Sequence, residues 1–273
     1  MGLLSGKRGI IMGIANEFSI ASGVAEFIKK EGGVSGFSHL PDAEGAPPRM
    51  ARRVQKVADS LGVNFVRPCD VRSDADIERF FGEVAGEFGS IDFLVHSIAY
   101  APLDDIQCAT LDASRSGFQI AMDISVYSFI ACARAASKLM GAGGSIVTMT
   151  YFGGERVVVG YNMMGVCKSA LESATKYLAY DLGPKNIRVN AVSAGPVKTL
   201  AASAVGDVDD MLALYDVVAP LQRNTTAEEV GRSTGFLLSD LSSGTTGEIL
   251  HVDCGFNVMG GPGRGFSKTS TQP

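Results

Sequence analysis

Tyr161 and Lys168 are the residues of this 273-residue chain whose types and spacing best suit catalysis. The stretch around them predicts a helix, on which seven residues turn the chain through about 700° and advance it by about 10 Å. The phenol and the ammonium then lie on one helix face. There the ammonium can donate to the sugar hydroxyls of a ligand and lower the pKa of the phenol. The same two residue types at this spacing also occur on ordinary surface helices, so other parts of the chain must decide between the two interpretations.

Cysteine and histidine form no comparable pattern. The five cysteines lie far apart in the sequence, which argues against a zinc site or a disulfide framework and favours a reducing cytosol. Cys167, beside Lys168, is interpreted as a packing residue of a buried helix rather than a nucleophile. His96 lies within an apolar run and is interpreted as a core residue whose hydrogen bonds are satisfied.

Strands and helices are predicted in alternation along the chain. Apolar runs predict strands at residues 8–12, 34–38, 64–67, 91–97, 145–150, 187–193 and 248–252. Helical periodicity predicts helices at residues 19–30, 49–61, 74–88, 114–140, 161–182, 208–216 and 227–238. This order predicts an α/β fold with one doubly wound, Rossmann-type parallel sheet and helices on both faces. We expect residues 1–259 to form a single domain and residues 260–273 to be a flexible tail.

Ligands of such a sheet bind beyond the carboxyl ends of its strands. The first strand is followed by Gly13, by further small residues and by a helix N-terminus that can present free N–H groups to a pyrophosphate. The turn lacks the usual three glycines, and a turn capped by Ser19 explains it about as well. Asp70 follows the third strand, where it could hold an adenine amine or cap a helix or turn. The segment Ser97-Ile98-Ala99 places small residues at a central strand end.

Composition excludes some other functions. The formal net charge of -5 offers no electrostatic footprint for nucleic acid or an anionic membrane. No apolar run approaches the ~20 residues of a membrane span. The N-terminus carries no secretory leader, which favours a cytoplasmic location.

Motifs from most of the chain together resemble the bacterial NADH-dependent enoyl-acyl-carrier-protein reductases, a divergent branch of the short-chain dehydrogenase/reductase superfamily. The likeness covers about residues 5 to 259. It rests on Gly13-x5-Ser19-Ile20-Ala21, Asp70-Val71, His96-Ser97-Ile98-Ala99, Tyr151-x9-Tyr161-x6-Lys168, the stretch from Ile187 to Pro196 and the stretch from Thr199 to Ser203. The wider superfamily separates its tyrosine and lysine by three residues, whereas this chain separates them by six and has Gly165 at the shorter spacing.

The resemblance implies a reaction and a set of site residues. NADH would transfer a hydride to the β-carbon of a trans-2-enoyl thioester, carried by acyl carrier protein, in fatty-acid elongation; no metal would take part, and the enzyme would be a homotetramer. The catalytic residues would be Tyr151, Tyr161 and Lys168, with Lys168 also on the nicotinamide ribose. The other cofactor residues would be Gly13, Ala15, Ser19 and Ile20 at the pyrophosphate, Asp70 and Val71 at the adenine, Ser97, Ile98 and Ala99 at the nicotinamide half, and Val197 and Thr199 at the carboxamide and phosphates. The acyl pocket would be lined by Ala101, Tyr151, Met164, Ala201 and Met211, with substrate-binding helices near 197–216.

Some positions depart from the family pattern or leave alternatives open. Leu40 stands where many relatives have a polar residue, and the nearby Asp42 and Glu44 would repel a 2′-phosphate, which favours NADH over NADPH. Cys254 replaces an expected glycine and is interpreted as a packing residue. One alternative is a short-chain carbonyl or hydroxyacyl reductase, which the six-residue spacing and Tyr151 disfavour. A non-catalytic nucleotide-binding regulator is another, and it would be expected to lack Tyr161 or Lys168.

Overall fold

The computed structural model describes residues 2–197, 199 and 208–261. Its seven strands form one parallel sheet in the order β3-β2-β1-β4-β5-β6-β7. The strands are β1 (Arg8–Met12), β2 (Val34–His39), β3 (Val66–Pro68), β4 (Phe93–His96), β5 (Gly144–Thr150), β6 (Ile187–Ala194) and β7 (Ile249–Val252). The predicted doubly wound fold is confirmed. The direction of winding reverses between β1 and β4, so a crevice opens beyond the carboxyl ends of these two strands.

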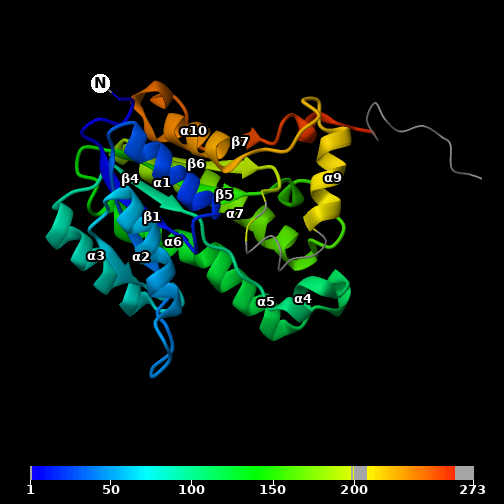
Figure 1. Cartoon of the computed structure of the whole chain (residues 1–273), viewed down its shortest axis with the longest axis horizontal. Helices are drawn as coiled ribbons and strands as arrows, with labels where there is room; N and C mark the ends of the chain where they lie inside the picture. Colours follow the sequence, from blue (N-terminus) through cyan, green and yellow to red (C-terminus); the bar gives the residue numbers. More distant parts are fainter. Residues whose placement is uncertain (1, 198, 200–207, 262–273) are drawn as a thin grey trace, which may run out of the picture.

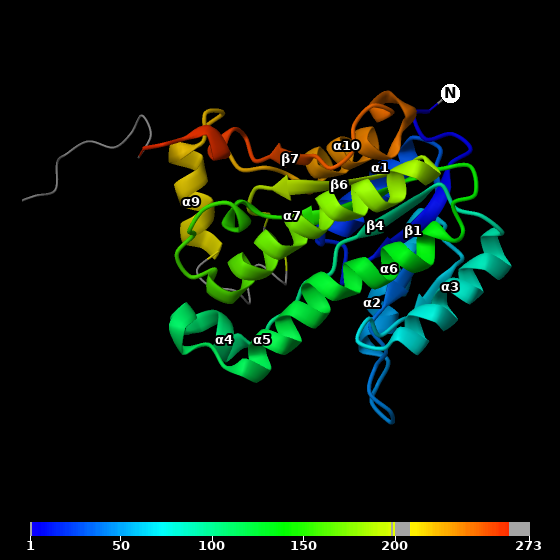
Figure 2. The ribbon, with the colours of Figure 1, turned by 180° about the vertical axis from the view of Figure 1, so that it is seen from behind.

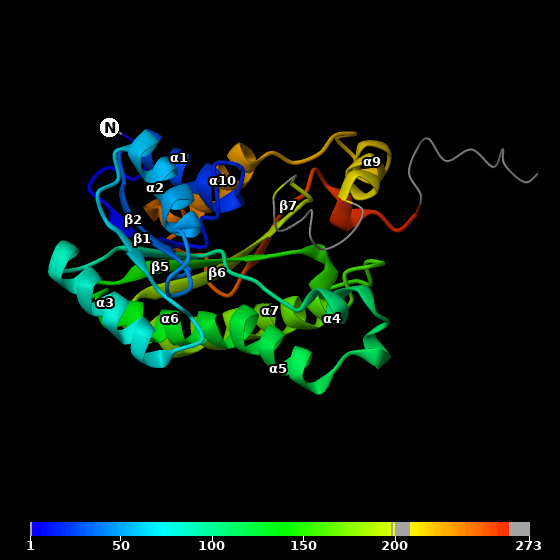
Figure 3. The ribbon, with the colours of Figure 1, turned by 60° about the horizontal axis from the view of Figure 1, so that its bottom comes forward.

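Helices cover both faces of the sheet (Figure 1, Figure 3). One face carries α1 (Ile20–Lys30), α2 (Arg49–Leu61) and α10 (Ala227–Leu238), and the other carries α3 (Asp74–Phe88), α6 (Ser128–Ser137) and α7 (Asn162–Leu182). Figure 2 shows α6 and α7 lying side by side across the second face. Three further helices gather beyond one end of the sheet: α4 (Leu103–Gln107), α5 (Arg115–Met122) and α9 (Val208–Val218). The functional site must lie where these helices meet the strand ends.

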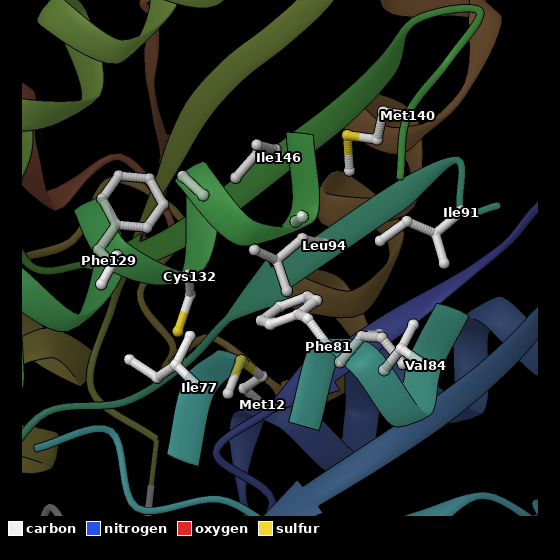
Figure 4. Close-up of a cluster of buried hydrophobic side chains, with 14 of the residues drawn as sticks. Met12, Ile77, Phe81, Val84, Ile91, Leu94, Phe129, Cys132, Met140 and Ile146 are labelled. Atoms are coloured by element: carbon white, nitrogen blue, oxygen red, sulfur yellow. The ribbon is translucent and has the colours of Figure 1, made fainter. Parts of the chain in front are cut away.

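Two apolar layers, one on each face, hold the sheet between the helices. Along β1, Ile10 and Met12 pack toward α3 and α6, whereas Ile11 packs toward α1. Leu94 of β4 and Ile146 of β5 join the first layer, which Figure 4 shows in close-up. Because the central strands β1 and β4 are buried on both faces, they are nearly continuous apolar runs rather than alternating ones.

The helix predicted at residues 114–140 is interrupted. It consists of α5, a π-helical segment (Asp123–Tyr127) and α6, which ends at Ser137. The hydroxyl of Ser125 in the π segment donates to the carbonyl of Tyr100 and accepts from its N–H, each at 2.9 Å. Within the described part of the chain, Arg115–Ser137 is the one helical stretch long and apolar enough to cross a membrane, and half of its most apolar window is buried inside the fold. The tail predicted at 260–273 lies almost wholly outside the described residues.

Candidate active site

The turn after β1 brings the backbone of two neighbouring strands into close approach. Gly13 has a φ of +100°, a conformation that L side chains rarely adopt. A Cβ built on Gly13 would lie 2.1 Å from the carbonyl oxygen of Ser97, which directly follows β4. Only glycine therefore fits here, and it allows the turn that leads into α1 to pack directly against the end of β4.

The N-terminus of α1 is not capped by a side chain. Ser19 occupies the N-cap position, but its hydroxyl donates instead to the carbonyl of Asn16 at 2.7 Å. The interpretation of Ser19 as an ordinary side-chain cap is therefore wrong. The N–H groups of the first turn of α1 keep their capacity to bind an anion in the crevice.

Charged side chains at the ends of β2 and β3 are already engaged. Asp70 after β3 accepts from the guanidinium of Arg72 with both carboxylate oxygens, and its Oδ1 also accepts from the Arg72 N–H at 3.0 Å. Ser73 caps helix α3, so Asp70 is not a helix cap. Asp70 instead caps the turn after β3, where it accepts from the Arg72 N–H. Asp42 caps α2 by accepting from the N–H groups of Met50 and Ala51. Sequence patterns give no sign of either the Arg72 pairing or the Asp42 cap.

Tyr151, Tyr161 and Lys168 meet at the carboxyl end of β5. The rings of Tyr151 and Tyr161 are in edge-to-face contact, with centroids 4.8 Å apart. Lys168 is buried, and its Nζ donates to the carbonyl of Met149 at 2.8 Å. Helix α7 begins at Asn162, one residue later than predicted, and Asn162 has a φ of +30°. Tyr161 is thus the N-cap residue, and a regular helix does not join it to Lys168 as the spacing predicted.

Burial sets the protonation of the site. It raises the pKa of Tyr161 far above its usual value, so this phenol is a hydrogen-bond donor at neutral pH. Burial also lowers the pKa of Lys168 to about 8. The lysine therefore remains mostly charged at pH 7, beside a neutral phenol.

Two glycines allow the turn after β5 to pack against α7. A Cβ on Gly153 would lie 2.4 Å from the Tyr161 ring, and one on Gly154 would lie 2.6 Å from Oε1 of Glu172. Glu172 in turn accepts a hydrogen bond from the Thr150 hydroxyl at 2.6 Å. Consecutive β5 residues, Met149 and Thr150, are therefore tied to α7 one helical turn apart, at Lys168 and Glu172. The glycine pair is visible in the sequence, but the role of Glu172 is not.

The structure brings most of the predicted pocket residues together. Ala101 and Met164 are buried in one apolar cluster against which Tyr161 packs. The Tyr151 hydroxyl contacts the sulfur of Met211 at 3.3 Å. Val197 and Thr199 follow β6, at the same edge of the sheet as the other strand ends. Ala201 lies outside the described residues.

Other sequence interpretations can be compared with their surroundings. His96 is fully buried between Ser128 and Thr148, and burial lowers its pKa to about 3, which confirms a neutral core histidine. Cys167 is fully buried, as expected of a packing residue. Cys254 takes the left-handed conformation, with a φ of +57°, where a glycine would be unstrained.

A doubly wound parallel sheet with a buried tyrosine and lysine at the end of β5 defines a short-chain dehydrogenase/reductase. Residues 13–257 match a family model described as enoyl-(acyl carrier protein) reductase. The chain is 48% identical over 259 residues to the NADH enoyl-acyl-carrier-protein reductase 1 of Rhizobium meliloti, covering 95% of this chain and 93% of that protein. The chain therefore belongs to the enoyl-acyl-carrier-protein reductase family.

Solved structures agree with this assignment. An Anaplasma phagocytophilum enoyl-acyl-carrier-protein reductase in complex with NAD superimposes with a TM-score of 0.91 at 44% identity, covering 96% of this chain and 98% of that one. The Bacillus cereus enzyme with NADP⁺ and indole naphthyridinone also gives a TM-score of 0.91, at 46% identity, covering 95% of this chain and 100% of that one.

Proposed function

We propose that this chain reduces the carbon–carbon double bond of trans-2-enoyl thioesters on acyl carrier protein, with NADH as the reductant. One observation carries the proposal: a neutral, half-buried phenol and a charged, buried lysine lie at the end of β5, on the fold of the NADH-dependent enoyl reductases. Both groups would be dispensable in a nucleotide-binding regulator without catalytic activity.

The strand ends fit a dinucleotide cofactor. Gly13 allows the sharp turn between β1 and α1 to pack against Ser97, and the uncapped start of α1 offers N–H groups to a pyrophosphate. Asp70 stays ionised, because Arg72 lowers the pKa of its carboxyl, and it can accept from an adenine amine. The residues that would hold the cofactor are Gly13, Ala15, Ser19, Ile20, Asp70, Val71, Ser97, Ile98, Ala99, Lys168, Val197 and Thr199.

The side chains at the end of β5 divide the work of catalysis. When bound, NADH supplies the hydride that reaches the β-carbon of the enoyl thioester. Negative charge then develops on the thioester oxygen, and the Tyr161 hydroxyl is the donor that stabilises it. Lys168, held by the Met149 carbonyl, donates its remaining N–H groups to the nicotinamide ribose. Tyr151 packs edge-on against Tyr161 and limits the orientations that the phenol can take.

The acyl chain would lie in the apolar space beside these tyrosines. Tyr151, Ala101, Met164 and Met211 supply the described part of its wall, and Ala201 is proposed for the part that lies outside the described residues. A wall without charged groups suits an alkyl chain.

Oxidation of NADH with crotonyl thioester and with acetoacetyl thioester tests the proposal. We expect turnover of the enoyl substrate and little or none of the ketone. Turnover of the ketone alone would instead identify a carbonyl reductase.

We also propose that the enzyme is a homotetramer. Two separate surfaces support this assembly: the outward face of α7, where Tyr177 and Tyr180 are exposed, and the unpaired edge of β7. Two different self-complementary surfaces generate a tetramer with three twofold axes. Light scattering after size exclusion tests this, because Tyr180→Lys should give dimers if α7 is one of the two interfaces.

Residues 1–259 form a single domain in this proposal, since all seven strands belong to one sheet. The cytoplasm is the proposed location, because the five cysteines are free thiols, as expected in a reducing compartment.

A further inference from the structure

Tyr215 of α9 carries a buried hydroxyl that makes no hydrogen bond of good geometry within the part of the chain that the structure describes. The side chain is 1% exposed, and its oxygen is shielded from solvent. Leaving a hydroxyl buried and unpaired is unfavourable, and phenylalanine would fill the same space without that cost. The hydroxyl is therefore expected to gain a well-formed hydrogen bond at another stage of the reaction.

Packing fixes the direction of this hydroxyl. The Tyr215 ring stacks on Phe256, with centroids 3.9 Å apart and planes 9° from parallel. Phe256 in turn meets the ring of Phe152 edge-on at 5.7 Å. Phe152 directly follows Tyr151, so α9, the C-terminal turn and the turn after β5 converge beside the active-site tyrosines. Tyr215 cannot turn its hydroxyl toward solvent without breaking the stack.

The Tyr215 hydroxyl lies near that of Tyr151, because Met211, whose sulfur contacts the Tyr151 hydroxyl, lies one helical turn before Tyr215 on α9. Burial raises the pKa of both phenols. The Tyr215 hydroxyl lowers the pKa of Tyr151, whereas the Tyr151 hydroxyl raises the pKa of Tyr215 further. Tyr215 is therefore suited to donate and Tyr151 to accept. In the free enzyme, however, the Tyr151 hydroxyl is directed to the sulfur of Met211, a weak acceptor.

We propose that Tyr215 is a positioning residue that acts through Tyr151. When an acyl thioester enters the pocket, the Tyr151 hydroxyl leaves Met211 and becomes a second donor to the substrate oxygen, beside the Tyr161 hydroxyl. Its own oxygen then accepts the hydrogen of Tyr215. The chain of donors from Tyr215 through Tyr151 to the substrate strengthens the last hydrogen bond, because each bond polarises the next. This inference rests on the proposed enoyl reduction.

Tyr215→Phe tests the proposal because it removes the hydroxyl and keeps the stack on Phe256. With crotonyl-coenzyme A and NADH, kcat should fall about 5-fold, the effect of one neutral hydrogen bond. NADH affinity should not change, and Tm should stay equal or rise, since an unpaired buried hydroxyl is lost. In a Tyr151→Phe background the same substitution should have almost no effect on kcat. Tyr127→Phe is the matched control, because the Tyr127 hydroxyl contacts Asp74 of α3.

Two results would overturn the role of Tyr215: an unchanged kcat in Tyr215→Phe, or an equal loss in the presence and absence of the Tyr151 hydroxyl. Calorimetric titration with butyryl-coenzyme A, the saturated product, tests the same contact without turnover. We expect about 5-fold weaker binding to Tyr215→Phe, and unchanged binding would contradict the contact. If the wild-type enzyme does not oxidise NADH with crotonyl-coenzyme A, the proposed reaction fails, and the product titration still decides the role of Tyr215.

Discussion

Substituting Gly13 by alanine tests the close approach of β1 and β4. The new Cβ would lie 2.1 Å from the Ser97 carbonyl oxygen, in a backbone conformation with a φ of +100°. The unfavourable φ costs about 1–2 kcal/mol, and overpacking adds about 1–3 kcal/mol. The expected destabilisation is therefore about 2–5 kcal/mol, or a decrease in Tm on the order of 10 °C for a chain of this size.

Thermal unfolding followed by circular dichroism measures this loss. Gly86→Ala is the matched control, because a Cβ there meets nothing within 4 Å and the residue lies inside α3. The control should stabilise the protein by about 0.5–1 kcal/mol, since alanine is the better helix former. The folded fraction of Gly13→Ala should also bind NADH weakly, because relief of the clash moves the turn that faces the pyrophosphate. Equal Tm values for the two variants would show that β1 and β4 do not approach as closely as described.

The remaining predictions concern the cofactor and the carrier protein. Lys168→Ala should weaken NADH binding in calorimetry more than Tyr161→Phe, which should instead lower kcat by about 10²–10³-fold; unchanged affinity in Lys168→Ala would refute its role. Because burial holds the Lys168 pKa at about 8, below the usual 10.5, the folded enzyme loses this proton as pH rises through 8. NADH affinity should therefore fall above pH 8 in the wild type. An affinity that did not change between pH 7 and pH 10 would contradict this. NADH should exceed NADPH in kcat/KM by about 10-fold or more, since Asp42 keeps a negative charge near β2; a preference for NADPH would be inconsistent with that. Finally, Asp209→Lys with Asp210→Lys should raise kcat/KM for acyl-carrier-protein substrates and not for coenzyme A substrates, because carrier proteins are acidic; an equal response would exclude these residues from docking.

The sequence predicts the fold because central strands such as β1 and β4 are apolar runs buried on both faces, and the helices that cover the sheet bury one apolar side. It predicts the pair Tyr161 and Lys168 from their spacing, although the helix joining them begins only at Asn162. The side chain of Asn162 donates to the carbonyls of Ile106 and Cys108, more than fifty residues earlier, and no local pattern reports this contact. The sequence thus predicts correctly that Tyr161 and Lys168 lie at the end of β5, although a regular helix does not connect them.

Contacts between distant segments account for what the sequence does not reveal. Tyr215 lies among acidic and apolar residues of α9, and nothing near it in the chain marks it as facing Tyr151. Glu172 is a residue type typical of a helix surface, yet its side chain accepts a hydrogen bond from Thr150 of β5. Such roles depend on the packing of elements, which periodicity does not encode.

The π-helical segment at Asp123–Tyr127 gives the chain a register that a regular helix would not have. A π turn holds one residue more than an α turn, as if one residue had been inserted between α5 and α6. Deleting a residue within it would restore α-helical geometry, and the bulge that presents Ser125 to the segment after β4 would be lost. Ser125 would then turn away from both backbone groups of Tyr100, and the segment after β4 would lose its anchor. A change of one residue in length, without any change of side-chain chemistry, would thus disconnect α5 from the loop that carries Ile98 and Ala99.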